Sequence, residues 1–223
     1  MASDRSVGVV VGMAAEARIA RRLGWPVAIG GGTAAGAQRA AAALVAQGID
    51  ALVSFGLAGG LDPALRPGSL LVASAVVLDG RHYLADAALS LRLGGMTSHA
   101  VLGAMSIAAS PALKQRLHAE TGAAAVDLES GAVAREASAS GLPFAVLRAV
   151  CDPAGFALPP AALAALDAGG AIGIGRVLAS LAASPGQLPA LFRLAGDAAA
   201  ARAALLGRVR RLAGARGRSA KPR

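Results

Sequence analysis

Short β-branched runs alternate with helix-like segments along this chain, and this alternation constrains its fold more than any other feature. The first run, residues 7–11, reads Val-Gly-Val-Val-Val and ends at Gly12, and residues 14–23 continue as a helix with its charges on one side. A second helix is expected from a Thr33 cap to about Gln47. A strand and helix rhythm of this kind predicts a layered α/β domain.

The same pattern continues to about residue 150. We expect further strands at residues 26–30, 50–55, 69–78, 100–108, 123–127 and 143–150. We expect further helices at residues 111–120 and 129–141, and two alanine-rich helices after Pro160, the second spanning roughly residues 187–213. Residues 79–99 have no clear period and are predicted to be irregular or a hairpin, and Gly56–Gly60 is predicted to be a flexible loop at the edge of the sheet.

The composition favours one closely packed domain. Of the 223 residues, 55% are hydrophobic and only 3% are aromatic, so the core must form by close contact between helices and sheet rather than around large rings. We divide the chain into a catalytic domain, residues 1–186, and a C-terminal amphipathic helix with a basic tail, residues 187–223.

The basic charge is concentrated in this C-terminal segment. The net charge is +9, and residues 198–223 carry eight basic residues and no acidic one. A basic tail on a nearly neutral body argues against a nucleic-acid partner and is compatible with peripheral contact with an anionic inner-membrane surface. The alternative is that the helix packs on the domain, or on a second subunit, through an apolar stripe. That stripe comprises Leu191, Leu194, Leu205, Val209 and Leu212.

The cysteine and histidine content argues against a disulfide and against a structural metal. The lone Cys151 can form no intramolecular disulfide, and His82, His99 and His118 lack the spacing of metal ligands. No run reaches the ~18 to 20 apolar residues that a membrane-spanning helix needs. We therefore expect a cytoplasmic protein with no metal and no bound cofactor.

Acidic residues stand where two predicted strands end, which is where open α/β sheets place their ligands. Asp127-Leu128-Glu129 follows one strand, and Asp152 follows another. Cleavage of an N-glycosidic bond needs an acid for the departing base and an anion near the ribose hydroxyls, so Asp152 suits the first role and Glu129 the second. The alternative is that both residues are helix N-caps.

Four sequence blocks in one order resemble the nucleoside phosphorylase and nucleosidase superfamily. They are Gly12–Glu16 (GMAAE), Ser54–Leu61 (SFGLAGGL), Val126–Glu129 (VDLE) and Leu147–Asp152 (LRAVCD). The likeness is greatest to the methylthioadenosine/S-adenosylhomocysteine nucleosidases and to the hopanoid-associated phosphorylases, which remove adenine from adenosylhopane. The resemblance implies a three-layer α/β/α domain with a mixed, mostly parallel, twisted sheet, and a homo-oligomer.

The resemblance also implies roles for three carboxylates. Asp152 matches the residue that protonates or hydrogen-bonds adenine at N7, and Glu129 matches the carboxylate that binds the ribose hydroxyls. Glu16 matches the carboxylate that orients the attacking water in the nucleosidases. We therefore expect Asp152 and Glu16 to be catalytic and Glu129 to bind the substrate.

The same resemblance implies the rest of the pocket wall. The backbone that lies against the ribose or phosphate comprises Gly56, Leu57, Ala58 and Gly59. Leu128 replaces the family's usual methionine beside the ribose. The nucleosidases stack the purine on a phenylalanine, and the matching position in this sequence is Leu113. A leucine there would forgo the contact between two rings, which is worth ~0.5 to 1.5 kcal/mol. Phe156 is a candidate substitute.

The sequence is compatible with either water or phosphate as the nucleophile. Phosphorylases of the superfamily often carry an arginine and a serine at the positions of Ser54 and Leu57, so these residues favour water. The hopanoid-associated group, however, is named for phosphorolysis, and Arg18, Arg81 or Arg148 could contact phosphate as a co-substrate.

We therefore expect cleavage of a small-molecule or lipid-linked adenine nucleoside, with adenosylhopane as the first candidate. The products would be adenine and ribosylhopane or phosphoribosylhopane. The alternatives are hydrolysis of methylthioadenosine or S-adenosylhomocysteine, and an inactive module that binds nucleosides. A glycine-rich turn at residues 30–36 resembles a dinucleotide-binding turn, but Asp50 precedes the next strand instead of ending it, so a nicotinamide enzyme is disfavoured.

Overall fold

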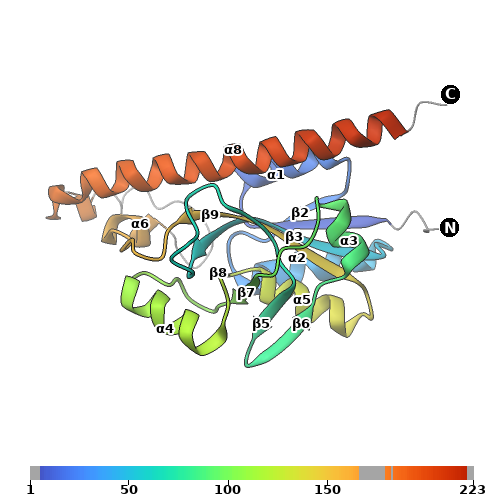
Figure 1. Ribbon diagram of the computed structural model, residues 1–223, viewed down its shortest axis with the longest axis horizontal. Coiled ribbons are helices and arrows are strands. Elements are labelled where there is room, and N and C mark those ends of the chain that lie inside the picture. Colours follow the sequence, from blue (N-terminus) through green and yellow to red (C-terminus); the bar gives the residue numbers. More distant parts are fainter. Residues whose placement is uncertain (1–5, 166–178, 182, 220–223) are drawn as a thin grey trace.

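The computed structural model describes residues 6–165, 179–181 and 183–219. These residues form one nine-stranded sheet with helices on both faces (Figure 1), so the predicted α/β fold is confirmed. The strands are β1 (Val7–Val11), β2 (Val27–Ile29), β3 (Ala51–Gly60), β4 (Leu70–Val72), β5 (Ala75–Leu78), β6 (Arg81–Leu84), β7 (Ala100–Gly103), β8 (Ala125–Asp127) and β9 (Phe144–Asp152). The helices are α1 (Ala14–Ala20), α2 (Ala34–Ala46), α3 (Ala87–Arg92), α4 (Pro111–Thr121), α5 (Ser130–Ala139), α6 (Pro160–Ala165) and α8 (Leu188–Ser219), with short 3-10 turns at η1 (Arg21–Leu23) and η2 (Pro185–Gln187).

The sheet is mixed, as predicted. Parallel pairs join β1 to β2 and β3, β3 to β9, and β7 to β5 and β8, whereas β3 with β8, β4 with β9 and β5 with β6 are antiparallel. The long parallel pairing of β3 with β9 ends with Gly59 opposite Asp152. The carboxyl ends of these two strands therefore meet at one edge, which is where a ligand site is expected.

Helices cover the sheet on two sides (Figure 1). Helices α2 and α5 bury alanines such as Ala41 and Ala134 against one face. On the other face, α1 and α8 bury residues such as Ala17 and Leu205. Small side chains let each helix approach the strands closely, which explains how a chain poor in aromatic residues forms a dense core.

The glycine-rich block is a strand, not a loop. The strand β3 continues through Gly60, so the predicted flexible loop at Gly56–Gly60 is wrong. The backbone of this block pairs with β9 up to Gly59 and with β8 at Gly59 and Gly60. These ladder hydrogen bonds hold the block in an extended conformation.

Other boundaries also differ from the prediction because the chain changes strand partners. Residues 69–78 form two strands, β4 on β9 and β5 on β7. In residues 79–99 the predicted hairpin is confirmed, since β6 pairs with β5 through a turn in which Asp79 and Gly80 are both at positive φ, but helix α3 was not predicted. Strand β7 ends at Gly103, so the next residues are free to line a cavity.

The C-terminal helix shares the core of the catalytic domain. Within the predicted apolar stripe, Leu205 and Val209 are fully buried, and Leu212 packs against the same cluster. This burial supports the alternative in which the helix packs on the domain. Within the described residues, no helix has the length and apolar character needed to cross a membrane.

Candidate active site

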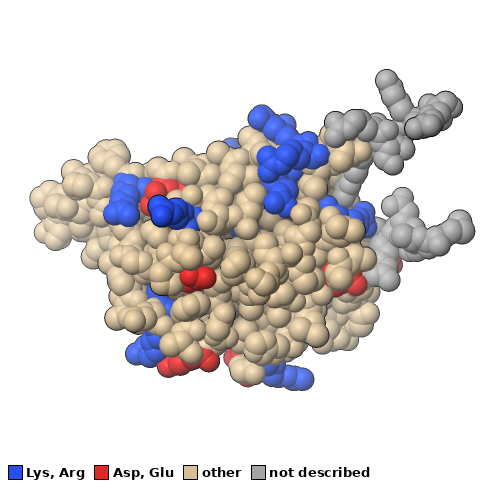
Figure 2. Space-filling model, viewed as in Figure 1, with Lys and Arg blue, Asp and Glu red and all other residues tan. Residues whose placement is uncertain are grey.

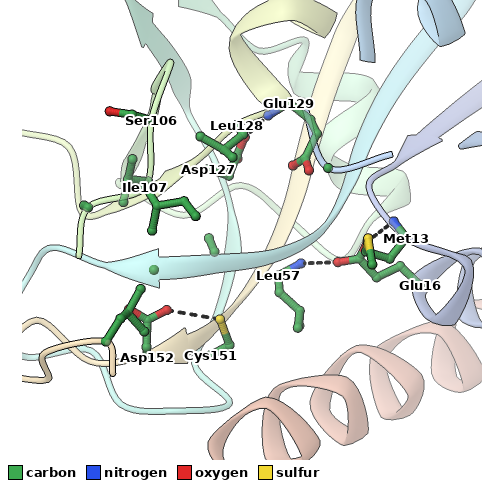
Figure 3. A pocket seen from close by; sticks show the side chains of 16 residues that line it. Met13, Glu16, Leu57, Ser106, Ile107, Asp127, Leu128, Glu129, Cys151 and Asp152 are labelled. Carbon is green, nitrogen blue, oxygen red and sulfur yellow. Dashed lines mark hydrogen bonds between the residues drawn. The ribbon is translucent and has the colours of Figure 1, made fainter. Parts of the chain in front are cut away.

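A cavity of about 270 Å³ lies at the carboxyl ends of β3, β8 and β9. It is lined by Met13, Glu16, Gly32, Leu57, Ala58, Gly59, Ser106, Ile107, Ala108, Val126, Asp127, Leu128, Glu129, Cys151, Asp152 and Leu158. Figure 3 shows acidic side chains reaching it from separate elements: Glu16 from α1, Glu129 from the start of α5, and Asp152 from the end of β9. Residues far apart in the sequence therefore share one small cavity.

Glu16 is held by two backbone amides at one side of this cavity. Its Oε2 accepts a hydrogen bond from the N–H of Met13, and its Oε1 accepts one from the N–H of Leu57, each at 2.8 Å. The side chain is buried and joins the first turn of α1 to β3. These two backbone donors are thus used by a carboxylate of the protein itself.

A buried arginine organises the neighbouring acidic residues. Arg148, whose side chain is 1% exposed, places Nε 2.8 Å from Asp127 Oδ2 and Nη2 3.1 Å from Glu129 Oε2. Its Nη2 also donates hydrogen bonds to the hydroxyls of Ser54 and Ser130 at 2.7 and 3.1 Å. We call these five residues the Arg148 cluster. One guanidinium thus serves two carboxylates, as its planar fork of donors allows.

Glu129 is the N-cap residue of helix α5, but the side chain of Asp127 makes the hydrogen bonds to the start of the helix. Its Oδ1 accepts hydrogen bonds from the backbone N–H groups of Glu129 and Ser130 at 2.8 and 2.6 Å. The Glu129 side chain makes no capping hydrogen bond, and no helix begins near Asp152, since α6 starts at Pro160. The N-cap alternative therefore holds for the position of Glu129 but not for its side chain, it does not hold for Asp152, and neither carboxylate is used by a helix N-terminus.

Burial gives Glu129 an unusual titration. The pKa of Glu129 is raised to about 7, chiefly by burial; the ion pair with Arg148 opposes the rise, and the charges of Asp127 and Glu16 contribute to it. Both protonation states of Glu129 are therefore populated near neutral pH.

A second buried cation lies at the opposite side of the cavity. Lys114, from the first turn of α4, forms an ion pair with Asp152 Oδ2 and donates hydrogen bonds to the carbonyl oxygens of Pro153 and Phe156 at 3.0 and 3.2 Å. The Cys151 thiol lies 3.2 Å from Asp152 Oδ1 and donates to it. We call these five residues the Lys114 cluster.

Burial also governs the titration of this cluster. It raises the pKa of Asp152, and Lys114 opposes the change through its charge and its hydrogen bond. Burial raises the pKa of the Cys151 thiol well above its usual range. The thiol therefore stays protonated and acts as a donor that orients Asp152.

Three glycines of the matched blocks make room for the carboxylates. A Cβ at Gly12 would lie 2.6 Å from Glu129 Oε1 and 3.2 Å from Glu16 Oε2, and one at Gly56 would lie 2.6 Å from Glu16 Oε1. A Cβ at Gly59 would lie 3.3 Å from both carboxylate oxygens of Asp152. The glycines are needed because the acidic side chains approach the strand backbone directly.

Most of the predicted site residues line this cavity. They are Glu16, Leu57, Ala58, Gly59, Leu128, Glu129 and Asp152. Gly56 lies behind the wall, where it leaves space for Glu16 and Arg148.

Leu113 and Phe156, which the sequence suggested as a wall for the purine ring, are not among the residues that line this cavity. Leu113 lies on α4 and packs against a core cluster that includes the cavity residues Ala108 and Val126. Phe156 is buried beneath Arg193, whose guanidinium carbon is 5.1 Å from the ring centroid. The cavity is instead lined by Ser106, Ile107 and Ala108 from the loop before α4.

The sequence interpretation also missed the roles of Lys114 and Cys151. A lysine four residues after Ser110 in a helix is ordinarily a solvated side chain, so nothing local marks its burial. Of the arginines considered for phosphate, Arg148 is fully engaged inside the protein, whereas Arg18 and Arg81 are exposed and line no part of this cavity.

Comparisons with known proteins show similarity in part of the sequence and in the fold. The family model described as the phosphorylase superfamily matches residues 25–117. A search of curated proteins found no match.

Several solved structures share the fold at low sequence identity. A mutant 5'-methylthioadenosine/S-adenosylhomocysteine nucleosidase of Helicobacter pylori, with 5'-methylthioadenosine in its active site, aligns with a TM-score of 0.65 and 17% identity over 93% of this chain and 99% of that chain. The S-adenosylhomocysteine nucleosidase of Streptococcus pyogenes, in complex with 5-methylthiotubericidin, gives 0.62 and 18% over 69% and 86%. A futalosine hydrolase mutant of Helicobacter pylori gives 0.59 and 19% over 66% and 89%. The superfamily resemblance expected from the motifs is confirmed.

Proposed function

From a chain with the motifs and the fold of the nucleoside phosphorylase and nucleosidase superfamily, we infer an enzyme that hydrolyses the N-glycosidic bond of an adenine nucleoside. The observation that carries the proposal is the convergence of Glu16, Glu129 and Asp152 on one cavity of about 270 Å³. This volume is close to the lower end of the range for small-molecule sites, about 300 Å³. It suits one nucleoside rather than a polymer.

Asp152 is the proposed general acid at the base end of the cavity. Burial raises its pKa, so its protonated form persists to higher pH than that of an exposed aspartate. As the bond from the sugar carbon to the purine breaks, its electron pair moves into the ring and the Asp152 proton passes to N7. Ile107 and Leu158 supply apolar wall for the base.

Glu129 is the proposed ligand of the ribose hydroxyls. When ionised, its carboxylate is a charged and therefore stronger acceptor for the ribose hydroxyls, and its pKa of about 7 places that change near neutral pH. The developing positive charge on the sugar is stabilised by a nearby anion, which strengthens this interaction in the transition state. We expect ribose binding to strengthen as the pH rises through 7.

Water is the proposed nucleophile because the site provides poorly for phosphate. Glu16 already occupies the N–H groups of Met13 and Leu57. Arg148 is paired with Asp127 and Glu129, so neither it nor these amides remains free for an anion. A phosphate dianion would meet the Glu16 carboxylate, which is instead suited to accept a proton from water.

Adenine is the proposed base because two of the structures that share the fold are complexes with 5'-methylthioadenosine and 5-methylthiotubericidin. For the 5' substituent, we keep adenosylhopane as the first candidate and methylthioadenosine as the second. The apolar residues Met13, Leu57 and Leu128 near the acidic groups are compatible with either.

The deciding experiment offers adenosylhopane and methylthioadenosine to the purified full chain, each with and without phosphate. We expect adenine release that does not depend on phosphate. Mass spectrometry of the sugar product should then show a hydroxyl group, not a phosphate, on the carbon that carried the base. A ribose 1-phosphate product would replace hydrolysis by phosphorolysis. Tight nucleoside binding without any adenine release would favour the alternative of an inactive binding module.

Peripheral membrane contact stays a proposal linked to the lipid substrate. Figure 2 shows basic side chains gathered over the C-terminal half of α8. Phe192 and Leu188, near its other end, are 75% and 43% exposed. We expect co-sedimentation with anionic vesicles that falls when Arg210 and Arg211 are changed to Gln, and unchanged sedimentation would remove the proposal.

A further inference from the structure

We propose that Lys114 is a positioning residue for Asp152, holding its carboxyl group in place and balancing the negative charge that appears there when the proton leaves. This inference rests on the proposed function, because it assigns a task within glycosidic cleavage. It concerns a residue that no local sequence pattern marks.

All the hydrogen bonds of the Lys114 side chain go to other groups of the protein. The residue is 0% exposed, and its ammonium donates to Asp152 Oδ2, to Pro153 O and to Phe156 O. An ammonium has three donors, so none remains for a ligand. Lys114 also does not line the cavity, whereas Asp152 does.

The same contacts fix the shape of the base end. The two carbonyl bonds tie the chain after β9 to α4, and the N–H of Leu158 donates to Ala109 O at 2.9 Å. The loop before α4, which includes Ile107, is thereby joined to the loop that carries Leu158. Movement of Lys114 would shift both walls together with the acid.

The charge balance of the reaction gives the ammonium its function. Before cleavage the proton is on Asp152, and afterwards it is on the purine nitrogen while Asp152 is a carboxylate. That negative charge forms in a buried site, where an opposite charge in contact is worth more than in water. Lys114 is already in place, so no reorganisation is needed as the charge develops.

Three groups face Asp152 from three elements, and their effects differ in sign. Lys114 on α4 lowers the pKa of Asp152, as does the hydrogen bond from the Cys151 thiol on β9. Asp197 on α8 raises it. Removing the charge of Lys114 and removing that of Asp197 should therefore move the titration of Asp152 in opposite directions.

The first experiment measures kcat/KM against pH for adenine release from methylthioadenosine. In Lys114→Met we expect kcat to fall about 100-fold, and the limb that reports loss of the Asp152 proton to move to higher pH. In Asp197→Asn the same limb should move to lower pH, and Lys114→Arg should restore part of the lost rate. A lower kcat in Lys114→Met with an unmoved limb would make Lys114 merely structural and overturn the inference.

The second experiment is a double-mutant cycle with Asp152→Asn. If Lys114 acts through Asp152, then Lys114→Met should cause no further loss of kcat in the Asp152→Asn background. A further large loss would overturn the inference. The double variant also removes both charges of the buried pair, so it remains informative if Lys114→Met alone fails to fold.

Wild-type activity separates this inference from the proposed function. If the wild-type chain releases no adenine from either nucleoside, the proposed function fails. The electrostatic coupling of Lys114 to Asp152 is then judged from the pH dependence of unfolding, which needs no substrate. Parallel profiles of wild type and Lys114→Met would contradict the coupling as well.

Discussion

The two ends of the cavity use a buried cation in different ways. In the Arg148 cluster, one guanidinium is shared by Asp127 and Glu129, and Glu16 lies close to them. In the Lys114 cluster, one ammonium pairs with Asp152 alone, and its other donors go to neutral carbonyl oxygens.

This difference sets the titration of each end. Where carboxylates outnumber the cation, burial and repulsion act together, and the pKa of Glu129 rises to about 7. Where one cation meets one carboxylate, the attraction directly opposes burial. The comparison teaches that burial raises the pKa of both acids and that neighbouring charges then modify it: Asp127 and Glu16 add to the rise at Glu129, whereas Arg148 and Lys114 each oppose it at their own end.

The largest effect is expected when the cation of the Arg148 cluster is removed. Arg148→Met leaves Asp127 and Glu129 buried without their cation, so we expect a loss of about 3 to 5 kcal/mol in the free energy of unfolding. Urea denaturation followed by circular dichroism measures it. The matched control is Arg135→Met, which removes an exposed ion pair with Asp79 and should cost under about 1 kcal/mol. Equal losses in both variants would contradict the cluster's role.

The next largest effect is expected when the proposed acid of the Lys114 cluster, Asp152, is replaced. Asp152→Asn removes a proton donor but keeps the size of the side chain, so kcat should fall about 100- to 10,000-fold. Substrate binding should change far less, because proton donation operates mainly in the transition state. Single-turnover adenine release and calorimetric binding of the nucleoside measure the two quantities. A loss confined to binding would remove Asp152 as the acid.

The variant Glu129→Gln tests whether the raised pKa of Glu129 makes the stability of the protein depend on pH. The pKa of Glu129 is raised from 4.5 to about 7 in the folded protein, so its protonated form contributes stability below 4.5 that is lost as the pH rises through 7. The substituted glutamine cannot ionise, so the variant should be more stable than wild type above pH 7, by on the order of 2 to 3 kcal/mol, and similar near pH 4. Unfolding at several pH values tests this, and a constant difference at all pH values would contradict it.

The same variant should also weaken catalysis at the ribose. The glutamine side chain keeps one acceptor oxygen but lacks the negative charge, so both ribose binding and kcat should fall. The loss should be greatest above pH 7, where wild-type Glu129 is ionised. Steady-state kinetics from pH 5 to 9 measures it.

A smaller effect is expected from crowding Asp152. In Gly59→Ala, the new methyl group would lie 3.3 Å from both carboxylate oxygens, which displaces the acid by a few tenths of an ångström. We expect about a tenfold loss in kcat. Gly155→Ala is the control, because no atom lies within 4 Å of its added Cβ. Comparable losses in the two variants would point to a general effect on the loop.

The smallest effects are expected at the residues that line, or were predicted to line, the base end of the cavity. Phe156→Leu should lower stability by about 1 kcal/mol through the lost contact with Arg193, with little change in KM. Ile107→Ala should instead raise KM several-fold, because Ile107 lines the cavity. The reverse pattern would restore Phe156 as the stacking residue.

The fold was largely predictable because its signals are local. The β-branched run at residues 7–11, the Thr33 cap and the proline at the start of α4 each act on neighbouring residues. The glycine-rich block was misjudged for the opposite reason. Its glycines lower the intrinsic preference for a strand, but pairing with β8 and β9 overrides that preference.

What the sequence determined by itself is the alternation of strands and helices and the selection of three acids, Glu16, Glu129 and Asp152, as candidates. Glu129 and Asp152 stand at the ends of predicted strands, and the resemblance of four short sequence blocks to a known superfamily singles out all three acids. The tertiary structure alone decided which cation each acid faces and which residues line the base end. Lys114 and Asp152 lie 38 positions apart, and only the packing of α4 beside the end of β9 brings their side chains together.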